Sequence, residues 1–318
     1  MTQPTLLDLQ TSVMDTHAFG KLDDYPLICE TLLELLASQK PTRIISPTDH
    51  NYQFFQYDGE YGHRITRPIN TNLFIETPPL FRSAYGRFLA FLDDIRRLQE
   101  TASQHPSIIA YCQTNEVNKV VYTIQQSIGG IGDSFENPNQ SRKRIGQLFE
   151  GFVKMIIQHL GLECEARNIN IPIPGFDGYT MPYELDLVIS KNKVVITAET
   201  NLIHPAEFIG SVKTTSKDRI DKIFLDKFML TKLLGRDIPV VAIFLHDVQR
   251  AKKGKSIFGI NSTFKSNHFL GYAVSLNKLD GVYYVDPRPI MTENARLREH
   301  IQDFQQFLIK DLWTLSNR

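Results

Sequence analysis

The middle of the chain carries short apolar runs with the two-residue alternation that is typical of β-strands. Cys164 to Ile173 predicts one strand, and Tyr183 to Thr200 contains two apolar runs joined by the polar, turn-like segment Ser190 to Lys193, which predicts a β-hairpin. Phe208 to Thr214 has strand character, and Ile238 to Leu245 is apolar throughout, as expected of a buried strand. These segments together predict one sheet.

Apolar residues at helical spacing flank these strands in the sequence. A strong helix is predicted over Ser141 to Gly161, with one apolar stripe and Gly161 as its stop signal. A second amphipathic helix begins at Asp218 and ends at Gly235. Downstream, the pattern predicts a basic loop, two strands and a terminal helix, over Gln249–Lys255, Phe269–Ser275, Val282–Val285 and Glu293–Leu315. From Ser141 onward, the order of elements indicates an α/β sandwich around a mixed sheet.

Residues 1–140 follow a different pattern, that of a mainly helical region. Helices are predicted over Ile28–Ser38, Phe81–Glu100 and Asn115–Ile128. Gly129 to Gln140 is rich in Gly, Asn, Asp and Pro, which favours a boundary at this point. We therefore expect two domains, residues 1–140 and residues 141–318.

Composition narrows the class of protein but does not identify a ligand. Lys plus Arg and Asp plus Glu both total 35, so a surface for a polyanion would need local basic clusters such as Arg142–Arg144, Lys213–Arg219 and Arg250–Lys255. The three cysteines are widely spaced, which excludes a disulfide framework and a zinc ribbon. The polar N-terminus and the lack of an apolar run of about 18 residues predict a soluble, cytoplasmic protein with no membrane contact.

An acidic residue interrupts the first run of the predicted hairpin. Asp186 lies in an otherwise apolar strand, where a buried carboxylate needs a cation or a metal ion as its partner. Lys213, in a later strand, is a candidate cation. Glu199 is 13 residues after Asp186 and Asp226 is 13 residues after Lys213, so spacing leaves both open as the second carboxylate.

Two carboxylates and a lysine at one sheet edge suit the metal-assisted hydrolysis of a phosphodiester. Carboxylate oxygens hold Mg²⁺, the ion neutralises phosphate charge and generates hydroxide, and the lysine stabilises the developing negative charge. The sequence has no GxSxG, HExxH, Walker A or CxxC motif, and its nine histidines are scattered singly. We therefore do not expect a metal site built on histidine.

Three segments of the chain carry a family pattern. SRKRIGQLFE, residues 141–150, is similar to an Arg-x-Gly-x-x-x-Glu helix start, and KTTSKDR, residues 213–219, is similar to a Lys-Thr-Thr/Ser-x-(Lys/Arg)-(Asp/Glu)-Arg block. Asp186 in its strand completes the set. Together these segments resemble the PD-(D/E)XK nuclease superfamily, and within it the type II restriction endonucleases of the EcoRII/NgoMIV-like branch. The resemblance covers about residues 141–245 and implies a restriction-endonuclease-like core.

The resemblance implies roles for the candidate catalytic residues. Lys213 is the implied catalytic lysine, and Asp186 is the implied metal-binding aspartate. Asp226 falls where this branch has a glutamate on the following helix, and Glu150 would be a helix carboxylate near a second metal ion. Asp186, Glu199 and Asn201 also allow the conventional Asp…Glu-x-Lys layout, with Asn201 at the lysine position. Glu199 therefore stays open as a metal ligand.

The same resemblance implies contacts to DNA. Lys217, Asp218 and Arg219 align with the base-contacting positions of the KTTSKDR block, and Arg144 aligns with the arginine of the helix start. Their chemistry suits this role, because Lys and Arg donate to guanine O6 and N7 and Asp accepts from cytosine N4.

The resemblance implies a Mg²⁺-dependent type II restriction endonuclease that hydrolyses double-stranded DNA at a palindromic, GC-containing site. A homodimer, or a tetramer, reads such a site with one half-site per subunit. A DNA methyltransferase is the implied functional partner, and residues 1–140 would add dimer contacts or contacts to flanking bases. Two other functions stay open, a structure-specific or repair nuclease of the same superfamily and an inactive DNA-binding module of the same fold.

Overall fold

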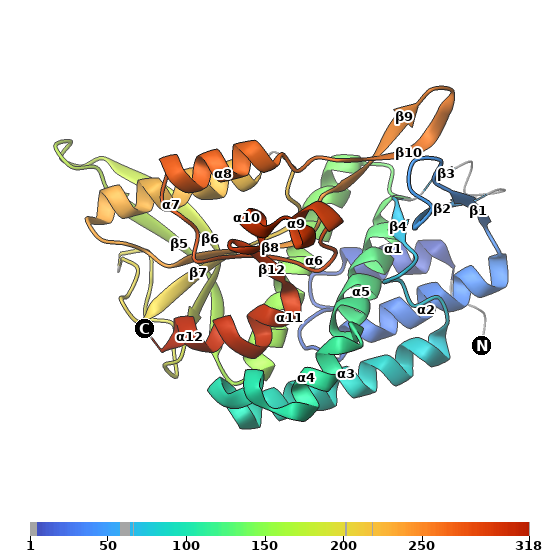
Figure 1. Ribbon diagram of the computed structural model, residues 1–318, viewed down its shortest axis with the longest axis horizontal. Helices are drawn as coiled ribbons and strands as arrows, with labels where there is room; N and C mark the ends of the chain where they lie inside the picture. Colours follow the sequence, from blue (N-terminus) through green and yellow to red (C-terminus); the bar gives the residue numbers. More distant parts are fainter. Residues whose placement is uncertain (1–4, 58–63, 66, 201, 218, 318) are drawn as a thin grey trace. The chain divides into compact units, whose positions relative to one another are not determined.

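The computed structural model describes residues 5–57, 64, 65, 67–200, 202–217 and 219–317 (Figure 1). The chain divides into two compact units, here called unit 1 and unit 2. Unit 1 comprises Met1–Phe91, Tyr111–Phe152 and Val248–Thr263, and unit 2 comprises Leu92–Ala110, Val153–Asp247 and Phe264–Arg318. None of the helices in the described residues combines the length and the apolar character that a membrane crossing requires.

Helices form most of unit 1, as its sequence predicts. They are α1 (Leu6–Met14), α2 (Asp24–Gln39), α3 (Pro78–Leu98), α4 (Pro106–Gln113), α5 (Glu116–Gly132) and α6 (Pro138–His159), of which α3, α4 and α6 continue into unit 2. A capping box between Thr5 and Asp8 starts α1. α5 packs against α1 and α2 and is buried over nearly its whole length, so it forms the centre of this unit.

The predicted boundary segment Gly129–Gln140 starts inside α5, which contains Gly129, Gly130 and Gly132. A Cβ atom at Gly129 would lie 2.1 Å from the guanidinium of Arg67, which forms an ion pair of 2.9 Å with Asp133. Glycine is therefore used here to let Arg67 approach the helix, and not to make a turn. The crossing between the two units that lies nearest residue 140 falls between residues 152 and 153, inside α6. The division into functional domains at residue 140 stays a prediction.

Unit 1 also holds two small antiparallel sheets. The first contains β1 (Thr42–Ile45), β2 (Tyr52–Tyr57), β3 (Arg64–Ile65) and β4 (Ile69–Asn70), and the second contains β9 (Val248–Lys253) and β10 (Ser256–Ser262). The prediction of a basic loop over Gln249–Lys255 is wrong, because these residues form the β9–β10 hairpin with Gly254 at φ +58° in its turn. Exposed lysines on a two-stranded ribbon give the polar composition of a loop.

A six-stranded mixed sheet forms the centre of unit 2, as the sequence predicts. Its strands are β5 (Glu163–Pro172), β6 (Thr180–Ser190), β7 (Glu207–Thr215), β8 (Val240–His246), β11 (Gly281–Tyr284) and β12 (Ile301–Asp303). They lie in the order β12-β11-β8-β7-β6-β5, parallel from β12 to β7 and antiparallel from β7 to β5.

Helices cover both faces of this sheet (Figure 1). One face is covered by α7 (Ile220–Leu234) and α8 (Ser266–Ser275), whose Phe224 and Phe269 rings lie 5.5 Å apart. On the other face, α11 (Phe304–Gln306), the π-helix η3 (Phe307–Asp311) and α12 (Leu312–Ser316) run as one stretch. The remaining helices of unit 2 are η2 (Gln99–Gln104), α9 (Pro289–Glu293) and α10 (Ala295–Arg298).

Three predicted elements of unit 2 are wrong. Phe269–Ser275 is part of helix α8, because a short apolar run fits a buried helix as well as a strand. The predicted terminal helix is interrupted by β12, which adds an edge strand to the sheet. The second strand of the predicted hairpin does not form, since β6 is already paired with β5 on one edge and β7 on the other. The carboxylate of buried Glu207 instead accepts hydrogen bonds from the backbone and hydroxyl of Thr197.

Candidate active site

A β-bulge in β6 places Asp186. The pairing of β5 with β6 leaves two residues, Asp186 and Leu187, facing the single residue Ala166. Because of this extra residue, Leu185 and Val188 on either side of the bulge both pack into the same apolar core. Bulges commonly re-aim a side chain beside an active site. The strand therefore keeps its apolar residues in the core on both sides of Asp186.

The carboxylate of Asp186 is bound by three donors from β7. Its Oδ2 accepts hydrogen bonds from the Ser211 hydroxyl and the Val212 backbone N–H, each at 3.0 Å, and from the Lys213 ammonium. Both charged side chains are mostly shielded, with 18% of Asp186 and 28% of Lys213 exposed. The strand carboxylate therefore has the lysine partner that its sequence context requires.

Asp186 and Lys213 lie in a cleft of about 750 Å³ that is lined by residues of β5, β6, β7 and α7. Three more of the predicted site residues line the same cleft, namely Glu199, Arg219 and Asp226. The structure thus brings together the predicted lysine, the predicted strand aspartate and both competing carboxylates.

One face of α7 forms a wall of this cleft. The residues of this face recur every three or four positions and are Arg219, Lys222, Ile223, Asp226, Lys227 and Leu230. The helix starts after the β7 turn, where the Ser216 carbonyl accepts from Ile220, and it stops at Gly235 with φ +66°. Lys222 is a cleft residue that the sequence analysis missed. Its helical spacing to Arg219 and Asp226 could have predicted that it lies on the same face of the helix.

The two competing carboxylates have different surroundings. Asp226 is half-buried, and burial raises the pKa of its carboxyl; nearby Asp186 raises this pKa further, while Lys222 and Lys213 oppose the increase. Glu199 is exposed, and its Oε1 accepts a hydrogen bond of 3.0 Å from the side-chain amide of Asn170. Asp226 is therefore the carboxylate that shares an electrostatic environment with Asp186 and Lys213.

The donor set of the cleft fits Mg²⁺. Within the described residues, no group of three or more His, Cys, Asp or Glu side chains is suited to hold a metal ion. Mg²⁺ usually takes one or two protein carboxylates and completes its shell with water and substrate phosphate. Asp186 together with Asp226 or Glu199 would supply such a pair of carboxylates.

Tyr183 is a further cleft residue that the sequence analysis did not single out. Its side chain is 9% exposed, and its hydroxyl is buried without a hydrogen-bond partner among the described residues. Burial raises the pKa of Tyr183, and the charge of Asp226 contributes to the same shift. An aromatic residue in a strand is ordinarily core, so its sequence position gave no signal for a role in the cleft.

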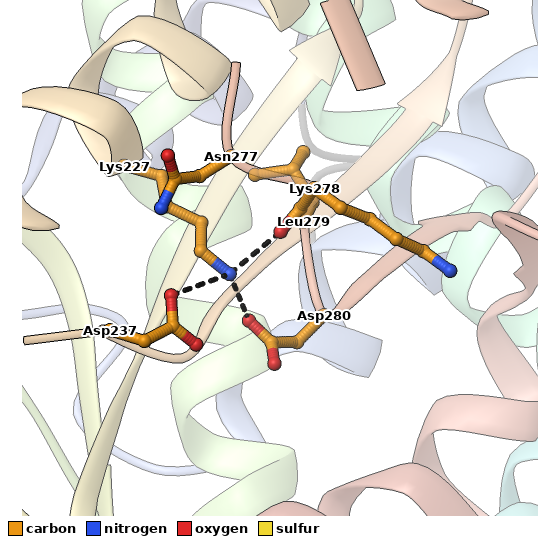
Figure 2. Close-up of a pocket in the computed structure, with 6 residues that line it drawn as sticks. All are labelled: Lys227, Asp237, Asn277, Lys278, Leu279 and Asp280. Carbon is orange, nitrogen blue, oxygen red and sulfur yellow. Dashed lines mark hydrogen bonds and ion pairs between the residues drawn. The ribbon is translucent and has the colours of Figure 1, made fainter. Parts of the chain in front are cut away.

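A buried lysine on the same face of α7 anchors the helix to the segment that precedes β11. Lys227 is 2% exposed, and its ammonium donates to the Lys278 carbonyl at 2.7 Å and to the Asp280 carboxylate at 2.6 Å. Figure 2 shows the Lys227 side chain directed at Asp280, with Asp237 beside it at 3.7 Å. The Asp280 carboxylate also accepts from the Val240 backbone N–H at 2.9 Å, which links the helix to the start of β8.

Removing one partner of this buried pair is expected to destabilise the protein strongly. Asp280→Ala leaves the Lys227 ammonium buried without its carboxylate, which typically costs about 3–5 kcal/mol of unfolding free energy. Lys232→Ala on the exposed side of α7 is the control, with an expected loss below about 1 kcal/mol. Urea unfolding of both variants measures the difference, and equal losses would contradict the anchoring role.

Two predicted site residues lie on the part of α6 that belongs to unit 1. Arg144 donates to the backbone carbonyls of Val13 and Asp15 at 2.7 and 2.6 Å, and its guanidinium lies over the Phe19 ring. These contacts give Arg144 a packing role within unit 1. Glu150 lies further along the same helix, partly buried. The DNA contact of Arg144 and the metal role of Glu150 stay predictions.

The remaining candidates lie around the turn between β7 and α7. Lys217 is exposed, and its backbone N–H donates to the Thr215 hydroxyl at 3.3 Å. Arg219 is exposed at the first turn of α7. Asp218 and Asn201 lie outside the described residues, so their predicted roles stay predictions.

Comparison with known proteins gives a structural likeness. No protein-family model and no curated protein matches the chain. The chain is similar to the crystal structure of the Type IIP restriction endonuclease Kpn2I, with a TM-score of 0.69 and 18% identity over 98% of each chain. A second solved structure, restriction endonuclease PspGI in complex with substrate DNA, matches with a TM-score of 0.36 and 12% identity over 74% of this chain and 93% of the other.

The likeness to Kpn2I extends over nearly the whole chain, so the protein has the fold of a type II restriction endonuclease. This confirms the predicted fold class, a restriction-endonuclease-like mixed sheet flanked by helices with a mainly helical N-terminal region.

Proposed function

We propose that the protein is a Mg²⁺-dependent type II endonuclease that hydrolyses phosphodiester bonds in double-stranded DNA at a specific site. One observation carries this proposal, namely that Asp186, Lys213 and Asp226 line a single cleft in this fold. A carboxylate pair with a neighbouring lysine is the donor set that phosphodiester hydrolysis with Mg²⁺ needs.

In this proposal, each cleft residue has a distinct task. Asp186 and Asp226 would hold Mg²⁺ through their carboxylate oxygens. The ion would neutralise charge on the phosphate and make the attacking water more acidic. The Lys213 ammonium, which pairs with Asp186, stabilises the negative charge that develops on the phosphate. Ser211 and the Val212 N–H hold Asp186 in one orientation, so the carboxylate is preorganised before DNA binds. Glu150 is proposed to act near a second metal ion.

Sequence recognition is proposed to come from the turn between β7 and α7. Arg219 is exposed and lines the cleft, which supports a contact to DNA beside the scissile phosphate. Lys217, Asp218 and Arg144 complete the proposed DNA contacts, and the target is a palindromic, GC-containing site read as in the EcoRII/NgoMIV-like branch. The enzyme would act as a homodimer or tetramer with one half-site per subunit, and would be paired with a DNA methyltransferase. Residues 1–140 would contribute dimer or flanking-DNA contacts.

Arg219→Ala is expected to weaken sequence discrimination while the chemistry persists. Loss of one guanine contact typically costs about 1–3 kcal/mol of discrimination at one base pair. Cleavage rates on the cognate site and on sites with single substitutions measure this difference. Lys193→Ala, an exposed charge change outside the cleft, serves as the control. An unchanged rate ratio for Arg219→Ala would contradict its role in base recognition.

The proposed function is tested by incubating the purified full chain with a large, fully sequenced DNA in Mg²⁺, with EDTA as a control. Discrete fragments that appear only with Mg²⁺ are the expected result, and mapping their ends gives the recognition site. A smear would point to the structure-specific or repair nuclease instead. Intact DNA would overturn the enzyme proposal, and a gel-shift assay in Ca²⁺ would then test for a DNA-binding module.

A further inference from the structure

We propose that Tyr183 is a positioning residue of the metal site. Its hydroxyl donates a hydrogen bond to the Asp226 carboxylate when the metal is bound, and thereby makes Asp226, and not Glu199, the second Mg²⁺ ligand. This inference rests on the proposed function and adds to it a residue that acts through Asp226.

The first argument is the unpaired hydroxyl. Tyr183 is 9% exposed, and its hydroxyl finds no hydrogen-bond partner among the described residues. Buried hydroxyls are normally paired, because an unpaired one loses its hydrogen bonds to water without compensation. The ring itself belongs to the apolar core under α7, where Phe would pack equally well. Packing therefore explains the position of the ring but not the presence of the hydroxyl.

The second argument is that an acceptor for this hydroxyl, the Asp226 carboxylate, lines the same cleft. Tyr183 and Asp226 line the same cleft, and the charge of Asp226 reaches the Tyr183 phenol. An ionised carboxylate only accepts hydrogen bonds, and a phenol supplies a donor. Carboxylates that bind metals are themselves usually held by a hydrogen bond to the oxygen that faces away from the ion. Tyr183 is suited to supply this bond to Asp226.

The third argument is the contrast with Glu199. The Glu199 carboxylate already accepts from Asn170 at 3.0 Å, and its backbone carbonyl accepts from the Asn170 N–H at 3.3 Å. These contacts tie it to β5 at an exposed position. Asp226 is half-buried and acts electrostatically together with Asp186. Asp226, and not Glu199, is the carboxylate whose charge contributes to the raised pKa of Tyr183.

The test compares Tyr183→Phe with Tyr179→Phe, in which the same hydroxyl is removed from a side chain that is 68% exposed. Three quantities are measured on the full chain: the unfolding temperature without metal, its rise with increasing Mg²⁺, and the Mg²⁺ concentration for half-maximal cleavage. For Tyr183→Phe we expect an unfolding temperature without metal that is unchanged or higher, because an unpaired buried hydroxyl does not stabilise the fold. We also expect a Mg²⁺ affinity that is about 10–100-fold weaker in both metal titrations. Tyr179→Phe should match the unmodified protein.

The possible outcomes separate this inference from the proposed function. A protein that neither cuts DNA nor gains stability with Mg²⁺ overturns the proposed function itself. If the unmodified protein does both and Tyr183→Phe has the same Mg²⁺ dependence, only the inference fails. A lower metal-free unfolding temperature with unchanged Mg²⁺ dependence would show a structural role and also overturn it. In an Asp226→Asn background, adding Tyr183→Phe should cause no further loss, and an additive loss would contradict action through Asp226.

Discussion

Replacing Asp186 with Asn is expected to reduce DNA cleavage by at least about 10³-fold while binding of the cognate duplex persists. The change keeps the size of the side chain but removes the charge that pairs with Lys213 and that is proposed to hold Mg²⁺. Metal stabilisation of a reacting phosphate is worth several kcal/mol, and each 1.36 kcal/mol is about tenfold in rate. Lys213→Ala removes a preorganised cation and should cost about 10²–10³-fold. Single-turnover cleavage and gel-shift titration in Ca²⁺ measure the two properties separately.

Matched surface changes provide the control for this prediction. Asp177→Asn and Lys193→Ala make the same chemical changes at exposed positions outside the cleft, and both should leave the rate unchanged. If Asp186→Asn or Lys213→Ala cut near the unmodified rate, the cleft would not be the active site. Loss of both cleavage and binding would instead indicate a folding defect, which thermal unfolding detects.

The pairing of Asp186 with Lys213 was predictable because it follows from a local energetic requirement. A carboxylate inside an apolar strand needs a cation, and the next long strand with a lysine supplied it. The helix over α7 was equally readable, since its apolar and polar positions repeat at helical spacing up to the stop at Gly235. The helix depends on residues that are close in the sequence, whereas Asp186 and Lys213 are 27 residues apart and meet because β6 and β7 are neighbouring strands.

The parts that could not be predicted depend on which strands meet. The segment after Ser190 has the composition of a hairpin strand, but β7 occupies the edge of β6 that this segment would have used. The bulge at Asp186 exists only relative to Ala166 on β5, so no pattern within β6 reveals it. The Tyr183 hydroxyl, which has no hydrogen-bond partner among the described residues, lies in a cleft that only the packing of α7 against the sheet creates. The charged residues of the site could therefore be predicted from the sequence, but the details of its geometry depend on long-range strand pairing and could not.

Asp226→Ala is expected to abolish cleavage, by about 10³-fold or more, whereas Glu199→Ala should reduce it by less than about tenfold. Asp226 is half-buried beside Asp186 and Lys213, and α7 holds it through the Lys227–Asp280 pair one residue further on. Glu199 is exposed and bound to Asn170. Both variants are assayed by single-turnover cleavage in Mg²⁺ and again in Mn²⁺, which tolerates a weakened ligand set better.

The response to Mn²⁺ identifies the ligand more sharply than the rate in Mg²⁺ does. A variant that has lost a direct metal ligand should stay inactive in Mn²⁺, while a variant that only disturbs the shape of the cleft should recover. Inactivity of Glu199→Ala in both metals, with Asp226→Ala still active, would move the metal from the α7 side of the cleft to the β5 side. The face of α7 that lines the cleft would then contact DNA through its exposed residues Arg219 and Lys222, and the proposed role of Tyr183 would fail with it.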